Sequence, residues 1–63
     1  MTAIIREYTD NLTKTGMNNP RATDHIFNSL AAMRRVCLET YDSEGVAYCE
    51  NKIKELIAHV KAR

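Results

Sequence analysis

The chain has 63 residues, of which 44% are hydrophobic and 27% are charged, and its formal net charge is +1. This length allows one domain at most, spanning residues 1–63, and the apolar content argues against a disordered chain. The balanced charge gives no sign of the clustered basic surface that nucleic-acid binding requires, and two Gly and one Pro are too few for a β fold rich in turns.

The first predicted element is a helix over residues 3–15. Thr2 precedes it as an N-cap, because a threonine hydroxyl can accept a hydrogen bond from a free amide of the first turn. Gly16 predicts the end of the helix, since glycine adopts the left-handed conformation of a C-cap without steric cost. The apolar face of this helix consists of Ile5, Tyr8 and Leu12.

The second predicted helix spans residues 20–41. Asn19 and Pro20 are typical of an N-cap followed by the first helical residue, because proline lacks an amide hydrogen that would be unpaired there. Thr23 and the residue after it offer a second start.

A turn over residues 42–45 follows, since Asp, Ser and Gly are frequent in turns. Asp42 or Ser43 then caps the third predicted helix, which spans residues 44–62. The spacing of the apolar residues places the second and third helices next to each other and antiparallel.

Two apolar series predict how these two helices pack. The series on the second helix is Ile26, Leu30, Met33 and Cys37, and the series on the third is Val46, Cys49, Ile53, Leu56 and Val60. Both alternate steps of three and four residues, which is the spacing of a helix that packs along another helix. Folding the chain back about Ser43 pairs Ile26 with Val60, Leu30 with Leu56, Met33 with Ile53, and Cys37 with Cys49.

One flank of this hairpin carries a second apolar strip, which consists of Phe27, Ala31, Leu38 and Ile57. Arg34 can reach Glu50 on the same flank. We expect the helix over residues 3–15 to cover the strip with its own apolar face, which gives an all-α three-helix bundle. The first helix could instead cross onto another subunit, because a chain of this size gains a larger core as a homodimer. The sequence leaves monomer and dimer open.

The cysteine count and the N-terminal residues predict the compartment. Two cysteines are too few for the disulfide framework of a small secreted protein. Residues 1–10 contain Arg6, Glu7 and Asp10 where a secretory signal needs an apolar run, and no apolar run is long enough to cross a membrane. We therefore expect a cytoplasmic protein with both thiols free and no membrane contact.

The sequence contains no motif typical of catalysis or of metal binding. There is no Gly-rich phosphate loop and no Ser–His arrangement. His25 and His59 lie twelve and ten residues from Cys37 and Cys49, too far along a helix to complete a zinc site with them. We therefore expect no enzyme activity, no cofactor and no metal.

By exclusion, we interpret the chain as a small noncatalytic interaction module, a regulator or adaptor, that binds a partner protein through an exposed helical face. Exposed aromatic and aliphatic residues mark such interfaces. The candidate partner-binding residues are Tyr8, Phe27, Arg35, Leu38, Tyr41 and Ile57.

Two alternatives stay open. The chain could bind nucleic acid as a dimer that aligns its basic side chains, although the helical positions of these residues distribute them around the bundle. The residues of this alternative are Arg34, Arg35, Lys52 and Lys54. The chain could also act as a thiol redox switch, since Cys37 and Cys49 are expected in one layer near the turn, although small buried core residues are the usual role of free cysteines at such positions.

Overall fold

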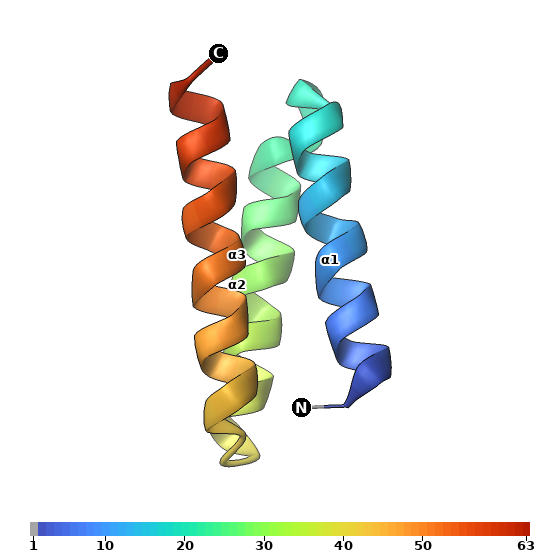
Figure 1. Cartoon of the computed structure of the whole chain (residues 1–63), viewed down its shortest axis with the longest axis vertical. Coiled ribbons are helices and arrows are strands. Elements are labelled where there is room, and N and C mark those ends of the chain that lie inside the picture. Colours follow the sequence, from blue (N-terminus) through green and yellow to red (C-terminus); the bar gives the residue numbers. More distant parts are fainter. Residues whose placement is uncertain (1) are drawn as a thin grey trace.

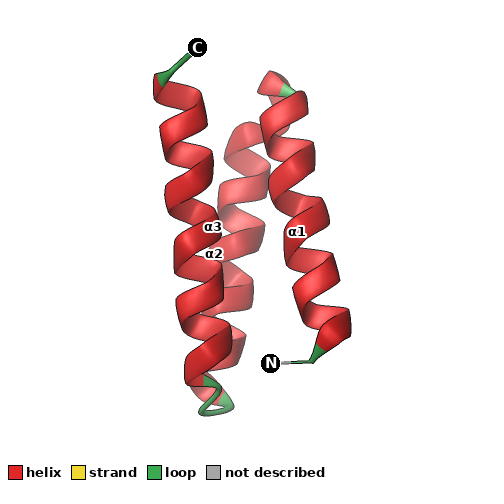
Figure 2. Cartoon of the chain, viewed as in Figure 1, coloured by secondary structure: helices red, strands yellow, loops and turns green. Residues whose placement is uncertain are grey.

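The structure is a computed structural model, and it describes residues 2–63. Over these residues the elements are α1 (Ala3–Asn18), a 3₁₀-helix η1 (Pro20–Ala22), α2 (Thr23–Glu39) and α3 (Ser43–Lys61). The three α-helices all contact one another and run in alternating directions along the long axis of the molecule (Figure 1). The described residues contain no strand (Figure 2). The prediction of an all-α three-helix bundle is therefore confirmed.

The first helix begins as predicted and ends later than predicted. The amide of Ile5 donates to Oγ1 of Thr2 at 3.2 Å, so Thr2 is the N-cap. Gly16 does not end α1. It is buried inside the helix, which continues to Asn18, and the chain turns at Asn19, whose amide donates to the carbonyl of Thr15 at 2.9 Å. The prediction of a stop at Gly16 was wrong because glycine also serves where a helix approaches its neighbours closely.

The second helix is shorter than the predicted span 20–41. Pro20 begins one turn of 3₁₀-helix, and the α-helix starts at Thr23, whose hydroxyl donates to the carbonyl of Gly16 at 3.2 Å. It ends at Glu39 because Tyr41 has a left-handed backbone, with φ of 58°. Asp42 then caps α3 by accepting from the amide of Gly45 at 3.0 Å, as predicted.

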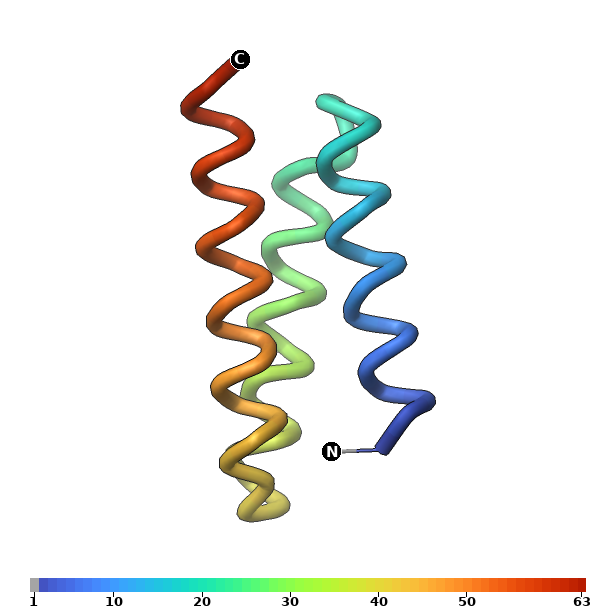
Figure 3. Tube along the Cα trace, in the orientation of Figure 1, coloured from blue at the N-terminus to red at the C-terminus, as the bar shows by residue number. Residues whose placement is uncertain are grey.

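The predicted hairpin is confirmed by the residues buried between α2 and α3. Leu30 and Leu56 are fully buried and form the core cluster with Ile26, and Ile53 packs against this cluster. Cys37 and Cys49 are buried as well. The helices α2 and α3 pack against each other. The Cα trace shows the start of α1 at the end of the bundle where the α2–α3 turn lies (Figure 3).

The expected position of the first helix was wrong. The helix α1 lies on the other side of the hairpin from the strip of Phe27, Ala31, Leu38 and Ile57. Leu38 remains 56% exposed, and Ala31 and Ile57 are exposed too. The buried face of α1 is instead formed by Thr9, Thr13 and Gly16.

Small and polar residues can fill this position because their hydrogen bonds stay inside α1. The hydroxyl of Thr9 donates to the carbonyl of Ile5 at 2.8 Å, and that of Thr13 donates to the carbonyl of Thr9 at 2.9 Å. Among residues 2–63, no buried side-chain oxygen or nitrogen therefore lacks a hydrogen-bond partner. The face built from threonine and Gly16 brings α1 close to the hairpin, while Tyr8 stays half-exposed.

Candidate protein-interaction surface

Three grooves run between the helices, and polar side chains close the one between α1 and α3. The hydroxyl of Tyr48 donates to the carboxylate of Asp10. The Nζ atom of Lys52 lies 3.4 Å from Oδ1 of Asp10 and 3.3 Å from Oε2 of Glu55. The ring of Tyr48 also lies 5.3 Å from Lys52 Nζ and 5.8 Å from the guanidinium carbon of Arg6. This cluster fixes α1 against α3.

The Tyr48–Asp10 hydrogen bond changes the acidity of both groups. It lowers the pKa of Asp10 below 3.8, with a further contribution from the charge of Lys52. The same bond, together with desolvation, raises the pKa of Tyr48 above 10.0. A tyrosine with a raised pKa stays protonated at neutral pH, so this cluster does not supply an activated base.

At the far end of the same groove, the C-terminal residue Arg63 binds the end of α1. Its guanidinium donates to the carbonyls of Gly16 at 3.1 Å and Met17 at 3.3 Å, and Nε2 of His59 lies 3.0 Å from the Met17 carbonyl. These contacts satisfy carbonyls that the last turn of a helix leaves without an internal partner. This role of Arg63 was not predicted from the sequence, because the contacting residues lie more than 40 positions apart in the chain.

The groove between α2 and α3 lies on the side of the hairpin that we call the outer flank. Its residues are Phe27, Arg34 and Leu38 on α2 and Val46, Glu50 and Ile57 on α3. Nε and Nη2 of Arg34 each lie 2.9 Å from Oε1 of Glu50, so the predicted ion pair is confirmed. Phe27 and Ile57 lie seven residues from Arg34 and Glu50, two helical turns away on the same flank. Phe27 also packs against the core cluster.

The outer flank ends in a shallow apolar concavity at the α2–α3 turn. Its volume is about 250 Å³, and Cys37, Leu38, Tyr41, Asp42, Ser43 and Val46 line it. We call this concavity and its lining the hairpin tip. Leu38 and Val46, one from each helix, form its apolar walls. The tip therefore presents an open apolar site at the end of the molecule.

Tyr41 holds an unusual position at the hairpin tip. The amide of Asp42 donates to the carbonyl of Cys37 at 2.8 Å, and the amide of Tyr41 donates to that of Leu38 at 3.2 Å. This pair of bonds is a Schellman motif, and Tyr41 occupies its left-handed position, where glycine is usual. The left-handed conformation costs a residue with a side chain about 1 kcal/mol. The Tyr41 side chain is nevertheless 96% exposed, so packing does not explain its presence.

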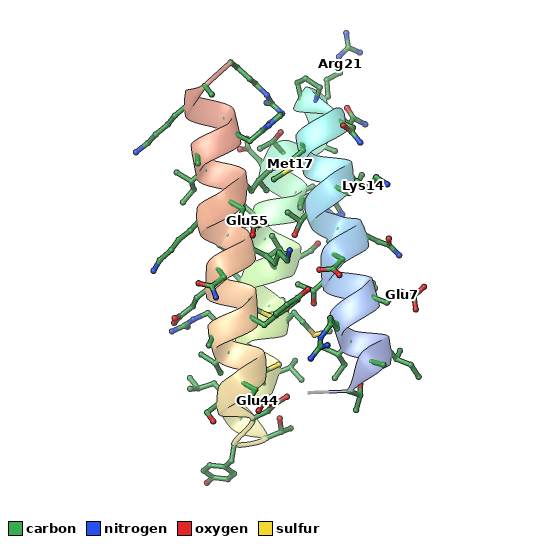
Figure 4. The ribbon with its side chains drawn as sticks, viewed as in Figure 1. Glu7, Lys14, Met17, Arg21, Glu44 and Glu55 are labelled. Atoms are coloured by element: carbon green, nitrogen blue, oxygen red, sulfur yellow. The ribbon has the colours of Figure 1, made fainter. Side chains whose placement is uncertain are left out.

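The segment of the chain that forms the hairpin tip is rich in acidic residues. Between Arg35 and Lys52 the chain contains no basic residue and four acidic ones, which are Glu39, Asp42, Glu44 and Glu50. Figure 4 places Glu44 at this end and Arg21 at the opposite end. A partner bound at the tip therefore meets an apolar site beside carboxylates.

The structure brings only some of the predicted partner-binding residues together. Leu38 and Tyr41 share the hairpin tip, and Ile57 lies farther along the outer flank. Arg35 is exposed and pairs with Glu39 at 3.4 Å. Tyr8 lies in the third groove, between α1 and α2, with Ser29, Ala32, Met33 and Val36. The separation of Tyr8 follows from the position of α1.

The basic residues of the nucleic-acid alternative do not form one surface. Arg34 and Arg35 pair with Glu50 and Glu39, whereas Lys52 lies in the α1–α3 groove and contacts Asp10 and Glu55. Lys54 is exposed on α3. The carboxylates beside these cations reduce the positive potential that a phosphate backbone would meet.

The two thiols of the redox alternative are free and buried close to each other. Burial raises the pKa of the Cys49 thiol, and interaction with Cys37 raises it further. Such a thiol is a weak nucleophile at neutral pH. Within residues 2–63, no three His, Cys, Asp or Glu side chains are grouped so as to hold a metal ion.

Comparison with known proteins adds no assignment, since no family model, curated protein or solved structure matches the chain. None of the described helices combines the length and the apolar character needed to cross a membrane. The geometry of the described residues is therefore the basis for a functional proposal.

Proposed function

We propose that this chain is a small noncatalytic interaction module that binds a partner protein through the hairpin tip. The observation that carries the proposal is Tyr41. Its ring is almost fully exposed although its backbone occupies a conformation that favours glycine. A side chain kept at such a position without packing is typical of a binding site, where local strain is retained for function.

The surroundings of Tyr41 support a protein partner. Leu38 is 56% exposed beside it, and together with Val46 it forms the wall of the apolar concavity. An exposed aromatic ring next to an apolar hollow is the composition of an interface hot spot.

A photo-crosslinking experiment tests this proposal. The photoreactive residue p-benzoylphenylalanine replaces Tyr41 in one variant and Asn28, an exposed residue of α2 outside the hairpin tip, in a second variant. Both proteins are expressed in the source cells and irradiated. We expect a defined protein adduct from position 41 and none from position 28.

Substitutions then test whether formation of the adduct depends on the hairpin tip. Leu38→Asp should reduce the yield of the adduct about tenfold or more, because it places a charge in the apolar concavity. Asn28→Asp is the matched control, because it adds a charge at an exposed position elsewhere on α2 and should leave the yield unchanged. Equal adducts from positions 41 and 28, or no effect of Leu38→Asp, would contradict the proposal.

The nucleic-acid alternative predicts a different outcome of the same experiment. Its adduct would contain an oligonucleotide, would disappear after nuclease treatment, and would weaken steeply as salt is raised. The pairing of Arg34, Arg35 and Lys52 with carboxylates is the reason to favour the protein partner.

A further inference from the structure

The groove between α1 and α2 differs from the other two because, among the described residues, no Lys, Arg, Asp or Glu lines its concavity. Two helical stripes with spacing i, i+4, i+7, i+11 form its rims. They are Ile4, Tyr8, Asn11 and Thr15 on α1, and His25, Ser29, Ala32 and Val36 on α2. Between the rims lies a concavity of about 250 Å³, lined by Tyr8, Ser29, Ala32, Met33 and Val36. We call this surface the uncharged groove.

The uncharged groove is also open, whereas charged side chains bridge the other two grooves. Asp10 and Lys52 lie across the α1–α3 groove, and Arg34 and Glu50 lie across the outer flank. In the uncharged groove Ile4 is 79% exposed, and Tyr8 and Val36 are each about half-exposed. Tyr8 and Val36 line the same concavity, and Ile4 lies about one helical turn from Tyr8 on α1.

The orientation of α1 makes this exposure notable. The helix buries Thr9 and Thr13 and turns Ile4 and Tyr8 toward solvent. An amphipathic helix normally buries its large apolar residues. A helix that buries threonine and exposes isoleucine and tyrosine retains apolar surface for a second contact.

We propose that the uncharged groove binds the same groove of a second copy of this chain. A charged partner surface would lose its hydration here without finding counter-charges, so the groove favours an uncharged partner. The second copy offers such a surface. An isologous contact requires a surface that fits itself. The groove combines a projection, the half-exposed Tyr8 ring, with a hollow whose α2 side includes the small residues Ser29 and Ala32.

A two-fold axis parallel to the helices satisfies this fit. It places Tyr8 of each copy over Ala32 of the other, and it sets α1 of each copy against α2 of the other. The helices that meet are antiparallel, as α1 and α2 are within one chain (Figure 1). The contact is then a four-helix bundle in which the two uncharged grooves form the new core.

The size of the molecule agrees with a dimer of this kind. The bundle measures 34 × 18 × 15 Å, so a face that runs its whole length covers at most about 600 Å², at the lower limit of what each partner contributes to a stable interface. Among the described residues, Leu30 and Leu56 are the large apolar side chains that the chain buries fully by itself. A 63-residue domain with so small a core gains stability from association.

Sedimentation equilibrium tests the dimer with the full chain at concentrations from about 1 µM to about 1 mM. We expect the wild-type mass to approach twice 7.2 kDa as concentration rises. Val36→Glu should weaken the dimer about tenfold or more, because it would bury a charge in the groove. Leu38→Glu is the matched control, since Leu38 lies on the same helix with similar exposure but faces the outer flank, and it should leave the dimer intact.

A second pair of variants excludes an effect through folding. Ala32→Glu and Ala31→Glu place the same residue at adjacent exposed positions of α2, and only position 32 lines the groove. Circular dichroism should show equal helix content for both. A wild-type chain that stays monomeric at the highest concentration would overturn the proposal. So would equal weakening by Ala31→Glu, or a dimer that survives both Ala32→Glu and Val36→Glu.

These outcomes are independent of the proposed function. The dimer uses the uncharged groove, whereas the partner is expected at the hairpin tip, so Leu38 variants affect partner crosslinking and Val36 variants affect mass. A monomeric wild-type chain that still crosslinks through Tyr41 would remove the dimer alone. A dimer that gives no adduct through Tyr41 would remove the proposed function alone.

Discussion

Gly16 approaches Ile26 so closely that a β-carbon on Gly16 would lie 3.0 Å from Cγ2 of Ile26. The same β-carbon would lie 3.1 Å from Cδ2 of Leu56, so the glycine faces core residues of both other helices. The distance at which α1 packs on the hairpin therefore depends on the absence of a side chain at this position.

Gly16→Ala should destabilise the protein by about 1 kcal/mol. Alanine in a helix interior normally adds about 0.5–1 kcal/mol of stability relative to glycine. Overpacking a core costs about 1–3 kcal/mol, and the contacts at Gly16 are tight enough for this cost to exceed the gain. Urea unfolding measures the change. Asn51→Ala, at an exposed position of α3, is the control and should be neutral or stabilising. A stabilised Gly16→Ala variant would show that α1 can move away without loss.

Leu30→Ala should destabilise by about 3 kcal/mol, since it removes three carbon atoms from a fully buried side chain. Ile53 packs against the same cluster but is only partly buried, so Ile53→Ala should cost roughly half as much. Thermal unfolding followed by circular dichroism measures both. Arg35→Ala, at an exposed position, should change stability by less than about 0.5 kcal/mol. Equal effects of the three changes would contradict the hairpin core.

The packing of α2 against α3 was predictable from the sequence because it depends on large apolar residues at regular spacing. Leu30 and Leu56 pair as the period indicates, and Arg34 meets Glu50 on the flank that follows from the same register. Asp42 caps α3 by the local chemistry that its residue type indicates. Each of these features depends on neighbours in one helix or across one short turn.

The position of α1 was not predictable from the same pattern. Thr9 and Thr13 are polar by residue type, and their burial depends on hydrogen bonds to carbonyls inside α1. Gly16 fits a helix end and a close helix contact equally well, and only the packed structure separates the two. Since Tyr8 belongs to α1, its separation from Leu38 in the candidate surface could not be predicted either.

The hydrogen bond between Tyr48 and Asp10 predicts how stability depends on acid. The pKa of Asp10 is lower in the folded chain than its ordinary value of 3.8. The stabilisation from the ionised carboxylate is therefore complete above that value and is lost as the pH falls through the lower pKa of the folded state. Melting temperatures at pH 7 and pH 2.5 should show a smaller acid-induced drop for Asp10→Asn than for wild type. An unchanged drop would mean that this bond does not link α1 to α3 in solution.

The buried thiols predict slow reaction of the folded protein. Burial raises the pKa of Cys49, so the thiol remains protonated near pH 7.5, and both sulfurs are shielded from solvent. Iodoacetamide should modify Cys37 and Cys49 much more slowly in the native protein than in urea. Mass spectrometry follows the modification, and it also detects a Cys37–Cys49 bridge through the loss of two hydrogen atoms. Rapid native bridging by a disulfide oxidant would support the redox-switch alternative instead.

Tyr41→Gly should separate stability from binding. Glycine adopts the left-handed backbone of this position without the steric cost that tyrosine carries, so the variant should be more stable by about 0.5–1 kcal/mol. The substitution also removes the exposed ring from the hairpin tip, so capture of the partner through a photoreactive residue at Leu38 should fall about tenfold or more. Urea unfolding and crosslinking yield are measured on the same preparation.

Thr40→Gly is the control, because Thr40 has an ordinary φ of −94°, and glycine there should lower stability. If Tyr41→Gly gains stability and keeps full crosslinking, the strained tyrosine has no part in binding; if it loses stability, its ring makes contacts that support the fold.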